Sequence, residues 1–484
     1  MLRSLMHLGF CGLLATAAVA QSRPSSAPAA NPAAAQRGAQ TAARYELTAQ
    51  RIIQAAMREN AAYDKLERLC DDVGCRISGS PALERAVDWA VATLRADGQD
   101  CVRAEPVMVP KWVRGEESLQ MIEPRRRPVE MLGLGGSVGT PEEGITAPVV
   151  SVRDENALRE LGDAVAGRIV LFDFPMPTGR EERGAGYGSA VRFRGNGASW
   201  AAKQGAVACL IRSVTTRSLR SPHTGAMHYV DTPRRIPAAA VSVEDAAMIS
   251  RLCARGVPVV VTLKMQARDE RMSPSANVVA ELCGSERPDE IVVISGHLDS
   301  WDVGQGANDD GGGCATAMEA INVLRKLNLR PRRTIRVVLW TNEENGLAGG
   351  RQYARDHEWE LPRHVAAIES DSGVFAPTGF SVDHRDAQRQ SDAAAELEAL
   401  MSLVAALEIR EAGQGHSGAD VSPMREFGVL LMGQNADMTH YFDVHHTHAD
   451  TLDKVDPYQL SRHVAAMATM AYVLADMPGR LGEN

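Results

Sequence analysis

The stretch from Ile291 to Gly313 constrains the fold more than any other part of the chain. It begins with an apolar run rich in β-branched residues and ends in glycines, ahead of an apolar-periodic segment at Cys314–Leu327. The run predicts a buried strand, and the periodic segment predicts a helix. Burying charged groups between the two is costly unless a cation neutralises them, so this loop suggests a metal site. The polar side chains concerned are His297, Asp299, Asp302, Asp309 and Asp310.

The pattern of strand, loop and helix repeats through the C-terminal half of the chain. Strands are predicted at Ile291–Ser295, Thr334–Trp340, Val365–Ile368 and Gly428–Met432. Helices are predicted at Cys314–Leu327, Gly346–Asp356, Ser391–Leu407 and Pro457–Met477. Strands that alternate with helices in this way predict an α/β domain with a mostly parallel central sheet.

Each of these strands is followed by residues that can bind metal or transfer protons. In chain order they are His297, Asp299, Asp309, Glu343, Glu344, Glu369, Asp371, His445, His446 and His448. Ligands gather outside the carboxyl ends of parallel strands, so we expect these side chains to meet at one rim. Histidine and carboxylate without thiolate suit zinc, or manganese or cobalt, at a catalytic site. The number of donors fits two ions that share a carboxylate, with one carboxylate left free to accept a proton.

Residues 115–264 differ in character from the rest of the chain. Loops rich in Arg, Pro and Gly separate short strands, predicted at Ala147–Val152, Arg168–Phe172, Ala206–Ile211 and Val257–Leu263. One helix is predicted at Ser199–Gln204, and no cluster of titratable residues recurs. We therefore predict a β-rich module inserted into a catalytic domain formed by 45–114 and 265–484.

The N-terminus has the features of an exported protein. Met1–Ala20 contains one arginine, a short apolar core and Ala-Val-Ala before the expected cleavage site, which is typical of a secretory signal peptide. The apolar core is too short to span a bilayer, so we expect no membrane anchor and a periplasmic or secreted protein. Residues 21–44 are mainly Ala, Pro, Ser and Gln, which predicts a disordered or weakly helical leader.

Net charge and cysteine content limit the partners and the covalent chemistry. The net charge of −9 argues against a nucleic-acid-binding protein, which would present a basic face. Cleavage of the signal peptide would leave seven cysteines, in a compartment that permits disulfides. Cys70 and Cys75 are close enough in sequence to pair, and mostly buried free thiols are an equally good interpretation.

Four runs, GHLDSWDVGQGANDDGGG, TNEENGLAGG, ESDSG and HHTHADT, resemble the secreted co-catalytic zinc peptidases. This family includes leucyl aminopeptidases and glutamate carboxypeptidases, and the similarity is greatest to its plasma glutamate carboxypeptidase branch. The resemblance covers nearly the whole mature chain and implies a three-layer α/β/α catalytic domain. The segments AGRIVLFDF and RIPAAAVSVEDA are similar to the protease-associated domain that such peptidases often carry as an insert.

The resemblance also implies a role for each candidate residue. Asp309 would bridge two zinc ions and Glu343 would act as the general base. Asp299 would orient His297, as the imidazole ligands of zinc require. The residues implied as metal ligands are His297, Asp309, Glu344, Asp371 and His446.

Two of these assignments rest on the alignment of short motifs. In the last motif the ligand lies four residues before Asp450, which selects His446, with His448 as the second choice and a candidate substrate-binding group. Asp309 rather than Asp310 matches the bridging position, and a cis peptide between these two is implied. Asp420 and Glu369 are further candidates for substrate binding.

The function implied is an exported peptidase that acts on the ends of peptides. A dipeptidase that resembles plasma glutamate carboxypeptidase competes with an aminopeptidase acting on longer chains. A non-catalytic binding protein of the same fold is disfavoured because the chain keeps every implied ligand and the base. A glutaminyl cyclase-like enzyme would use one zinc and would normally lack the insert. A homodimer is implied by the resemblance alone.

Overall fold

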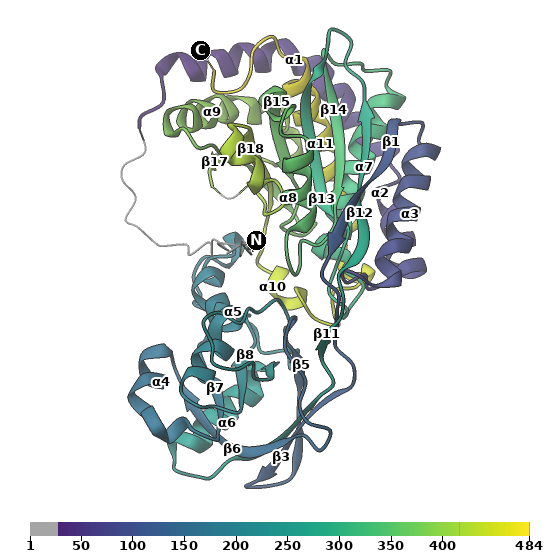
Figure 1. The fold of residues 1–484 in the computed structure, drawn as a ribbon. Coiled ribbons are helices and arrows are strands. Elements are labelled where there is room, and N and C mark those ends of the chain that lie inside the picture. Colours follow the sequence, from purple (N-terminus) through teal and green to yellow (C-terminus); the bar gives the residue numbers. More distant parts are fainter. Residues whose placement is uncertain (1–27, 416, 484) are drawn as a thin grey trace, which may run out of the picture.

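The computed structural model describes residues 28–415 and 417–483, and these form two lobes (Figure 1). The larger lobe combines the N-terminal and C-terminal parts of the chain, and the smaller lobe is built from the residues between them. The predicted signal peptide, Met1–Ala20, lies outside the described residues. Among the helices of the described residues, none has the length and apolarity needed to cross a membrane.

An eight-stranded sheet forms the centre of the larger lobe, in the order β1-β12-β14-β13-β15-β18-β16-β17. Strands β14, β13, β15 and β18 run parallel to one another. On one flank β12 is antiparallel to β14 and to β1, and on the other β16 is antiparallel to β18 and parallel to β17. The predicted α/β class is therefore confirmed. The strands are β1 (Asp100–Val109), β12 (Ser273–Leu282), β13 (Arg287–His297), β14 (Arg333–Trp340), β15 (His364–Glu369), β16 (Pro377–Asp383), β17 (Glu411–Gln414) and β18 (Leu430–Ala436).

Helices cover both faces of this sheet and make three layers (Figure 1). Side chains alternate along a strand, so Val292 and Ile294 of β13 pack in one core, while Val293 packs in the other core with Tyr353 of α8. The first core also contains residues of the N-terminal helices and of α7, α9 and α11. The helices of this lobe are α1 (Pro32–Arg58), α2 (Ala62–Arg68), α3 (Pro81–Ala96), α7 (Gly312–Lys326), α8 (Ala348–Asp356), α9 (Ala387–Leu400), α10 (Tyr441–Val444) and α11 (Pro457–Asp476).

Of the two alternatives predicted for residues 21–44, disordered or weakly helical, the structure shows a helix from Pro32 onward, where α1 begins. The Asn31 side chain caps this helix by accepting a hydrogen bond of 3.0 Å from the N–H of Ala33. Its small residues allow a close approach to α9, since a Cβ at Gly38 would lie 2.5 Å from the carbonyl oxygen of Glu396. A segment with few large apolar side chains is therefore buried by close backbone packing instead.

The smaller lobe contains a second eight-stranded sheet, in the order β4-β3-β10-β6-β7-β8-β9-β5. Its strands are β3 (Glu117–Glu123), β4 (Arg127–Val129), β5 (Met131–Gly133), β6 (Ile145–Val152), β7 (Ile169–Phe172), β8 (Ala208–Arg212), β9 (Ala238–Val241) and β10 (Val260–Met265). Strands β6 to β9 are parallel, and the helices are α4 (Glu155–Leu161), α5 (Tyr187–Lys203) and α6 (Val243–Ala254). Helix α5 begins well before the predicted Ser199, because the glycines in its first half weaken the helical pattern.

A two-stranded ribbon joins the lobes. It pairs β2 (Trp112–Val113) with β11 (Arg268–Asp269), the segments that leave and re-enter the larger lobe. The insert thus interrupts the larger lobe between β1 and β12, and it faces the carboxyl ends of the central strands (Figure 1).

Candidate active site

Asp309 lies at the centre of the candidate site, in a short turn between β13 and α7. Its Oδ1 atom is 3.2 Å from Nε2 of His297, the last residue of β13. Its Oδ2 atom is 3.2 Å from Nε2 of His446, which follows α10. The two oxygens of one carboxylate therefore face two imidazoles from different elements.

A further carboxylate accompanies each of these histidines. Oδ1 of Asp371, just after β15, is 3.5 Å from Nε2 of His297. Oε2 of Glu344, in the turn after β14, is 3.0 Å from Nε2 of His446. The structure thus brings together all five residues that the sequence implied as metal ligands, as two histidine–carboxylate pairs on either side of Asp309.

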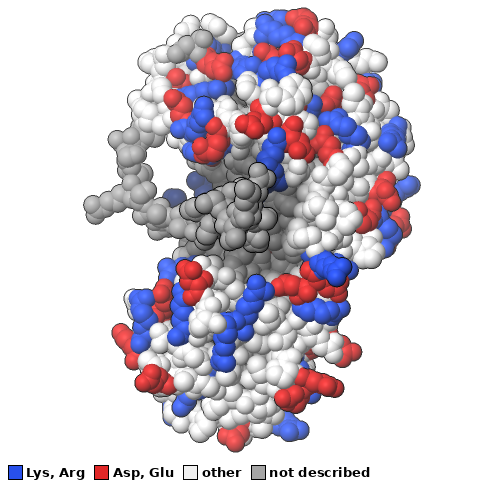
Figure 2. Space-filling model, in the orientation of Figure 1, with Lys and Arg blue, Asp and Glu red and all other residues white. Residues whose placement is uncertain are grey.

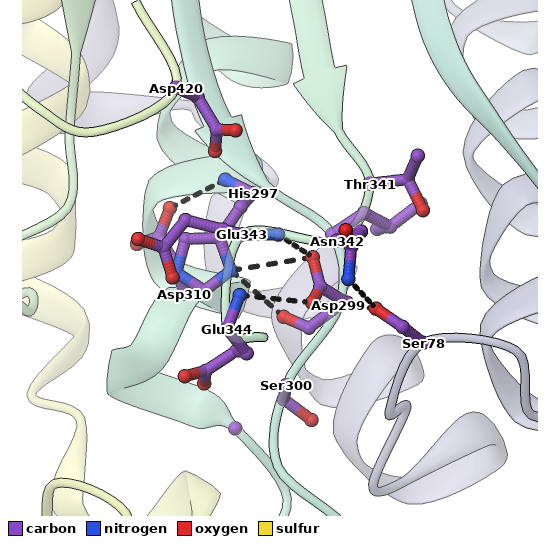
Figure 3. A network of polar contacts seen from close by, with 12 residues as sticks. Ser78, His297, Asp299, Ser300, Asp310, Thr341, Asn342, Glu343, Glu344 and Asp420 are labelled. Atoms are coloured by element: carbon purple, nitrogen blue, oxygen red, sulfur yellow. Dashed lines mark hydrogen bonds and ion pairs between the residues drawn. The ribbon is translucent and has the colours of Figure 1, made fainter. Parts of the chain in front are cut away.

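Asp299 acts differently from the expectation that its side chain orients His297. The hydrogen bond from Nδ1 of His297, 2.9 Å long, reaches the backbone carbonyl of Asp299, and the carboxylate lies 3.9 Å away. That carboxylate instead accepts hydrogen bonds from the N–H groups of Glu343 at 2.9 Å and Glu344 at 3.3 Å (Figure 3). Ser78 of the N-terminal segment donates a further bond of 3.2 Å to it. The side chain of Asp299 therefore fixes the turn that carries Glu343 and Glu344.

Other groups of the protein already pair with the remaining carboxylates near Asp309. Asp310 accepts from the N–H of His297 at 2.9 Å, and Asp450 accepts from the N–H of Asp309 at 3.1 Å. Asp302 pairs with Arg114 at 2.6 Å. These contacts explain why the acids closest to the ligands in sequence lie outside the ligand set. The implied cis peptide between Asp309 and Asp310 is present.

The smaller lobe supplies contacts to the site that sequence reasoning missed. Nδ1 of His446 is 3.2 Å from the carbonyl oxygen of Thr224, and the Thr224 N–H donates to the carbonyl of His446 at 3.0 Å. Arg194 is buried and donates to the Tyr187 hydroxyl at 2.9 Å, and one of its nitrogens lies 3.3 Å from Nδ1 of His446. Nothing in the local sequence pattern of the insert marks these residues, because their partners lie far along the chain.

The histidines of the last motif divide between the site and the surface. The rings of His445 and His446 stack with centroids 3.6 Å apart, and Nε2 of His445 is 3.6 Å from Oδ2 of Asp309. His448 is exposed, so its predicted place in substrate binding is not supported by the structure. The reason is local: Thr447 donates through its hydroxyl to the carbonyl of Val444 at 2.7 Å, and this turn separates His448 from the buried pair.

A cavity of about 800 Å³ opens onto the donor groups and is bounded by both lobes. Glu369, the last residue of β15, lines it and accepts hydrogen bonds from the N–H groups of Asp420 and Val421. Asp420 is buried behind this wall, and neither of its carboxylate oxygens has a hydrogen-bond partner among the described residues. In Figure 3 its side chain points toward the region of Glu343 and His297.

Crowding of buried carboxylates dominates the electrostatics of the site. Burial raises the pKa of Glu343 well above its usual range, with a further rise from Asp371 and Glu344. Burial and the neighbouring Asp309 raise the pKa of Glu344 to about 7. Although burial opposes it, the carboxylates of Glu344 and Asp309 raise the pKa of His446 to about 9. On the face shown in Figure 2, by contrast, acidic and basic side chains are interspersed over both lobes.

These donors fit divalent metal ions. Oδ2 of Asp309 and Oε1 of Glu344 are buried without a hydrogen-bond partner among the described residues. Buried carboxylates of this kind require a compensating cation. Two groups of potential ligands lie close enough to hold an ion, and Asp309 belongs to both: His297, Asp309 and Asp371, and Asp309, His445 and His446. The chemistry of the set, imidazole and carboxylate without thiolate, is typical of a catalytic zinc site.

An α/β sheet with such donors at the carboxyl ends of its parallel strands defines the class of α/β metallohydrolases. Within that class, the chain belongs to Peptidase family M28, whose family description matches residues 277–471. Human carboxypeptidase Q (Homo sapiens) is 42% identical over 87% of this chain and 86% of its own length. Carboxypeptidase Q of Rattus norvegicus is 43% identical over 90% of this chain and 90% of its own length. The predicted enzyme class, a metallopeptidase, is confirmed.

Solved structures agree with this assignment. A peptidase M28 precursor from Shewanella amazonensis SB2B has a TM-score of 0.86 and 38% identity, covering 91% of this chain and 98% of that one. An aminopeptidase from Aneurinibacillus sp. strain AM-1 has a TM-score of 0.60 and 21% identity, covering 89% of this chain and 97% of that one, and shares the fold.

Proposed function

We propose that this chain is an exported exopeptidase that holds two zinc ions and hydrolyses dipeptides or short peptides. The observation that carries the proposal is the placement of Asp309, whose two oxygens face two separate histidine–carboxylate pairs. One carboxylate shared in this way is what a pair of neighbouring metal ions requires. Manganese or cobalt would suit the same donors.

The ligands divide into two sets around the shared carboxylate. His297 and Asp371 would hold one ion, and His446 and Glu344 the other. When bound, the two ions would polarise the scissile carbonyl and lower the pKa of the attacking water. The remaining chemistry belongs to side chains of the protein.

Glu343 is placed to transfer protons. It lines the cavity, makes no ion pair with the histidines of the site, and is fixed by its N–H bond to Asp299. Glu343 accepts a proton from the attacking water while the water oxygen bonds to the carbonyl carbon. The C–N bond then breaks, and Glu343 returns the proton to the leaving nitrogen. Burial raises the pKa of the Glu343 carboxyl, which favours its uptake of a proton.

Charged groups of opposite sign in and beside the cavity suit the two ends of a short peptide. Glu369 lines the cavity and supplies an acidic group for a substrate ammonium, and the buried carboxylate of Asp420 lies behind it. Arg194 lines the cavity from the smaller lobe, and its guanidinium is a group that binds carboxylates. A dipeptide carries both charges close together, whereas an aminopeptidase substrate presents only its ammonium to such a site. This pairing favours the dipeptidase.

Three parts of the proposal depend on the sequence. Export rests on the signal-like Met1–Ala20, the identity of the insert with a protease-associated domain rests on its sequence segments, and a homodimer rests on resemblance. Each stays a prediction.

A hydrolysis panel on zinc-reconstituted protein tests the proposal. We expect turnover of free dipeptides, and much slower turnover of dipeptides with an amidated C-terminus or of longer peptides. Equal or faster turnover of amidated and longer peptides would establish an aminopeptidase instead. Absence of turnover on every substrate, with two zinc ions bound per chain, would reject both the dipeptidase and the aminopeptidase in favour of a binding protein.

A further inference from the structure

Strands β1 and β12 carry the chain into and out of the insert and lie side by side at the edge of the larger sheet (Figure 1). β1 is the edge strand, so among the described residues β12 is its only neighbour in that sheet. At the end of this pair that lies away from the insert, Asp100 stands opposite Glu281. Cys101 follows Asp100, and Cys283 follows the last residue of β12.

The sulfurs of Cys101 and Cys283 and a carboxylate oxygen of Glu281 all lie within 4.8 Å of one another. The register of the two strands is irregular here, and Cys101 adopts a left-handed backbone with φ of 52°. The N–H of Cys283 donates to the Asp100 carboxylate at 3.3 Å, which holds this segment against β1. The two thiols therefore face each other across an anchored strand end.

A metal ion is a poor occupant of this cluster. The Glu281 carboxylate already pairs with Arg336 at 2.8 Å and lies 3.6 Å from Arg103. Two sulfurs remain, which is the composition of a disulfide.

We propose that Cys101 and Cys283 form a disulfide bond that ties the edge strand to its neighbour and closes a loop containing the whole insert. The oxidant is a low-molecular-weight or protein disulfide, and the proposed export would supply oxidising surroundings. The Cys101 thiolate attacks one sulfur of that disulfide and releases one thiolate. Cys283 then loses its proton and attacks the Cys101 sulfur, which releases the second thiolate. Two electrons pass to the oxidant, which becomes two thiols.

The bond would act at the edge of the larger sheet, between β1 and β12. An edge strand keeps one partner, and β1 and β12 are the strands that lead into and out of the insert. A crosslink that closes so long a loop also restricts the unfolded chain strongly, which stabilises the folded state. Reduction would therefore lower the thermal unfolding temperature without touching the metal ligands.

The test uses the full mature chain, first reduced and then equilibrated in glutathione buffers from reducing to oxidising. Free thiols are alkylated and the digest is read by mass spectrometry. We expect a peptide linked through Cys101 and Cys283 and the loss of two free thiols under oxidising conditions. The linked peptide should be absent in C101S and C283S, and it should persist in C75S, a control at another exposed cysteine. Full alkylation of both cysteines in every buffer would overturn the proposal.

Two further measurements keep the proposal falsifiable if a variant folds poorly. Reduction should lower the unfolding temperature of the wild type and of C75S by several degrees, and leave that of C101S unchanged. An equal fall in C101S would overturn the proposal. So would zinc bound by the reduced protein in excess of the two proposed ions and lost in C101S, because it would make the cluster a metal site. Peptidase activity is assayed separately, so failure of the proposed function leaves this result independent.

Discussion

Nδ1 of His446 lies 3.2 Å from the carbonyl oxygen of Thr224, so the insert fixes the orientation of a proposed metal ligand that belongs to the other lobe. This contact leaves Nε2 of His446 directed at Asp309 and Glu344. A hydrogen bond to the far nitrogen of a metal-binding imidazole selects its tautomer and raises its basicity. The insert therefore completes the site, and it does so through a backbone atom that no side-chain motif records.

Replacing Glu343 with glutamine should lower turnover strongly and leave the metal bound. The amide keeps the shape of the side chain but cannot accept a proton, so we expect kcat to fall by about 10²–10⁴-fold. Zinc content, measured by elemental analysis, should stay at the wild-type value. The control is E398Q, at an exposed position on the rim of the same cavity. Activity near that of the wild type in E343Q would remove Glu343 from the mechanism.

Replacing Asp309 with alanine should release both ions, because each histidine–carboxylate pair would lose its shared ligand. We expect bound zinc to fall from two per chain to nearly none after dialysis. Circular dichroism should show that the chain is still folded. The matched control, D453A, removes an exposed carboxylate and should leave zinc content unchanged. Retention of both ions by D309A would show that the carboxylate does not bridge them.

The larger lobe and the ligands could be predicted because their signals are local. Apolar runs mark the central strands, and the residues after each strand share one rim of the sheet, so His297 and Asp371 could be grouped without coordinates. Contacts made between distant segments leave no such pattern, which is why Arg194 and Thr224 were missed. The first turns of α1 could not be told from disorder for another reason: close packing at Gly38 replaces the large apolar side chains that periodicity detects.

His357 should make stability depend on pH above neutrality. Its Nδ1 is 2.8 Å from Glu360 and its Nε2 is 3.0 Å from Glu105. Although burial and Arg336 oppose it, these two carboxylates raise its pKa from 6.5 to about 9. Because the folded-state pKa is the higher one, the stabilisation is fully present below pH 6.5 and is lost as pH rises through 9.

Urea unfolding of the wild type and of H357Q between pH 6 and pH 10 measures this dependence. We expect the free energy of unfolding of the wild type to exceed that of the variant most at pH 6. The difference between the two should shrink progressively toward pH 10. Taking the difference between the two proteins cancels the contributions of groups that titrate elsewhere, including those of the metal site. A difference that stays constant across the range would show that His357 contributes by packing alone.

Replacing Arg194 with methionine should weaken the binding of substrates that have a free carboxylate. A hydrogen bond to a charged group contributes about 1.5–3 kcal/mol, so we expect KM for free dipeptides to rise about 10–100-fold. KM for amidated dipeptides should change little, since they carry no carboxylate to bind. R183M is the control, because Arg183 lines the same cavity but is exposed and faces Glu411. Arg194 also lies 3.3 Å from His446, so zinc content is measured in both variants. An equal rise in KM for both substrates, or a loss of zinc, would mean that Arg194 positions the histidine and does not select the substrate.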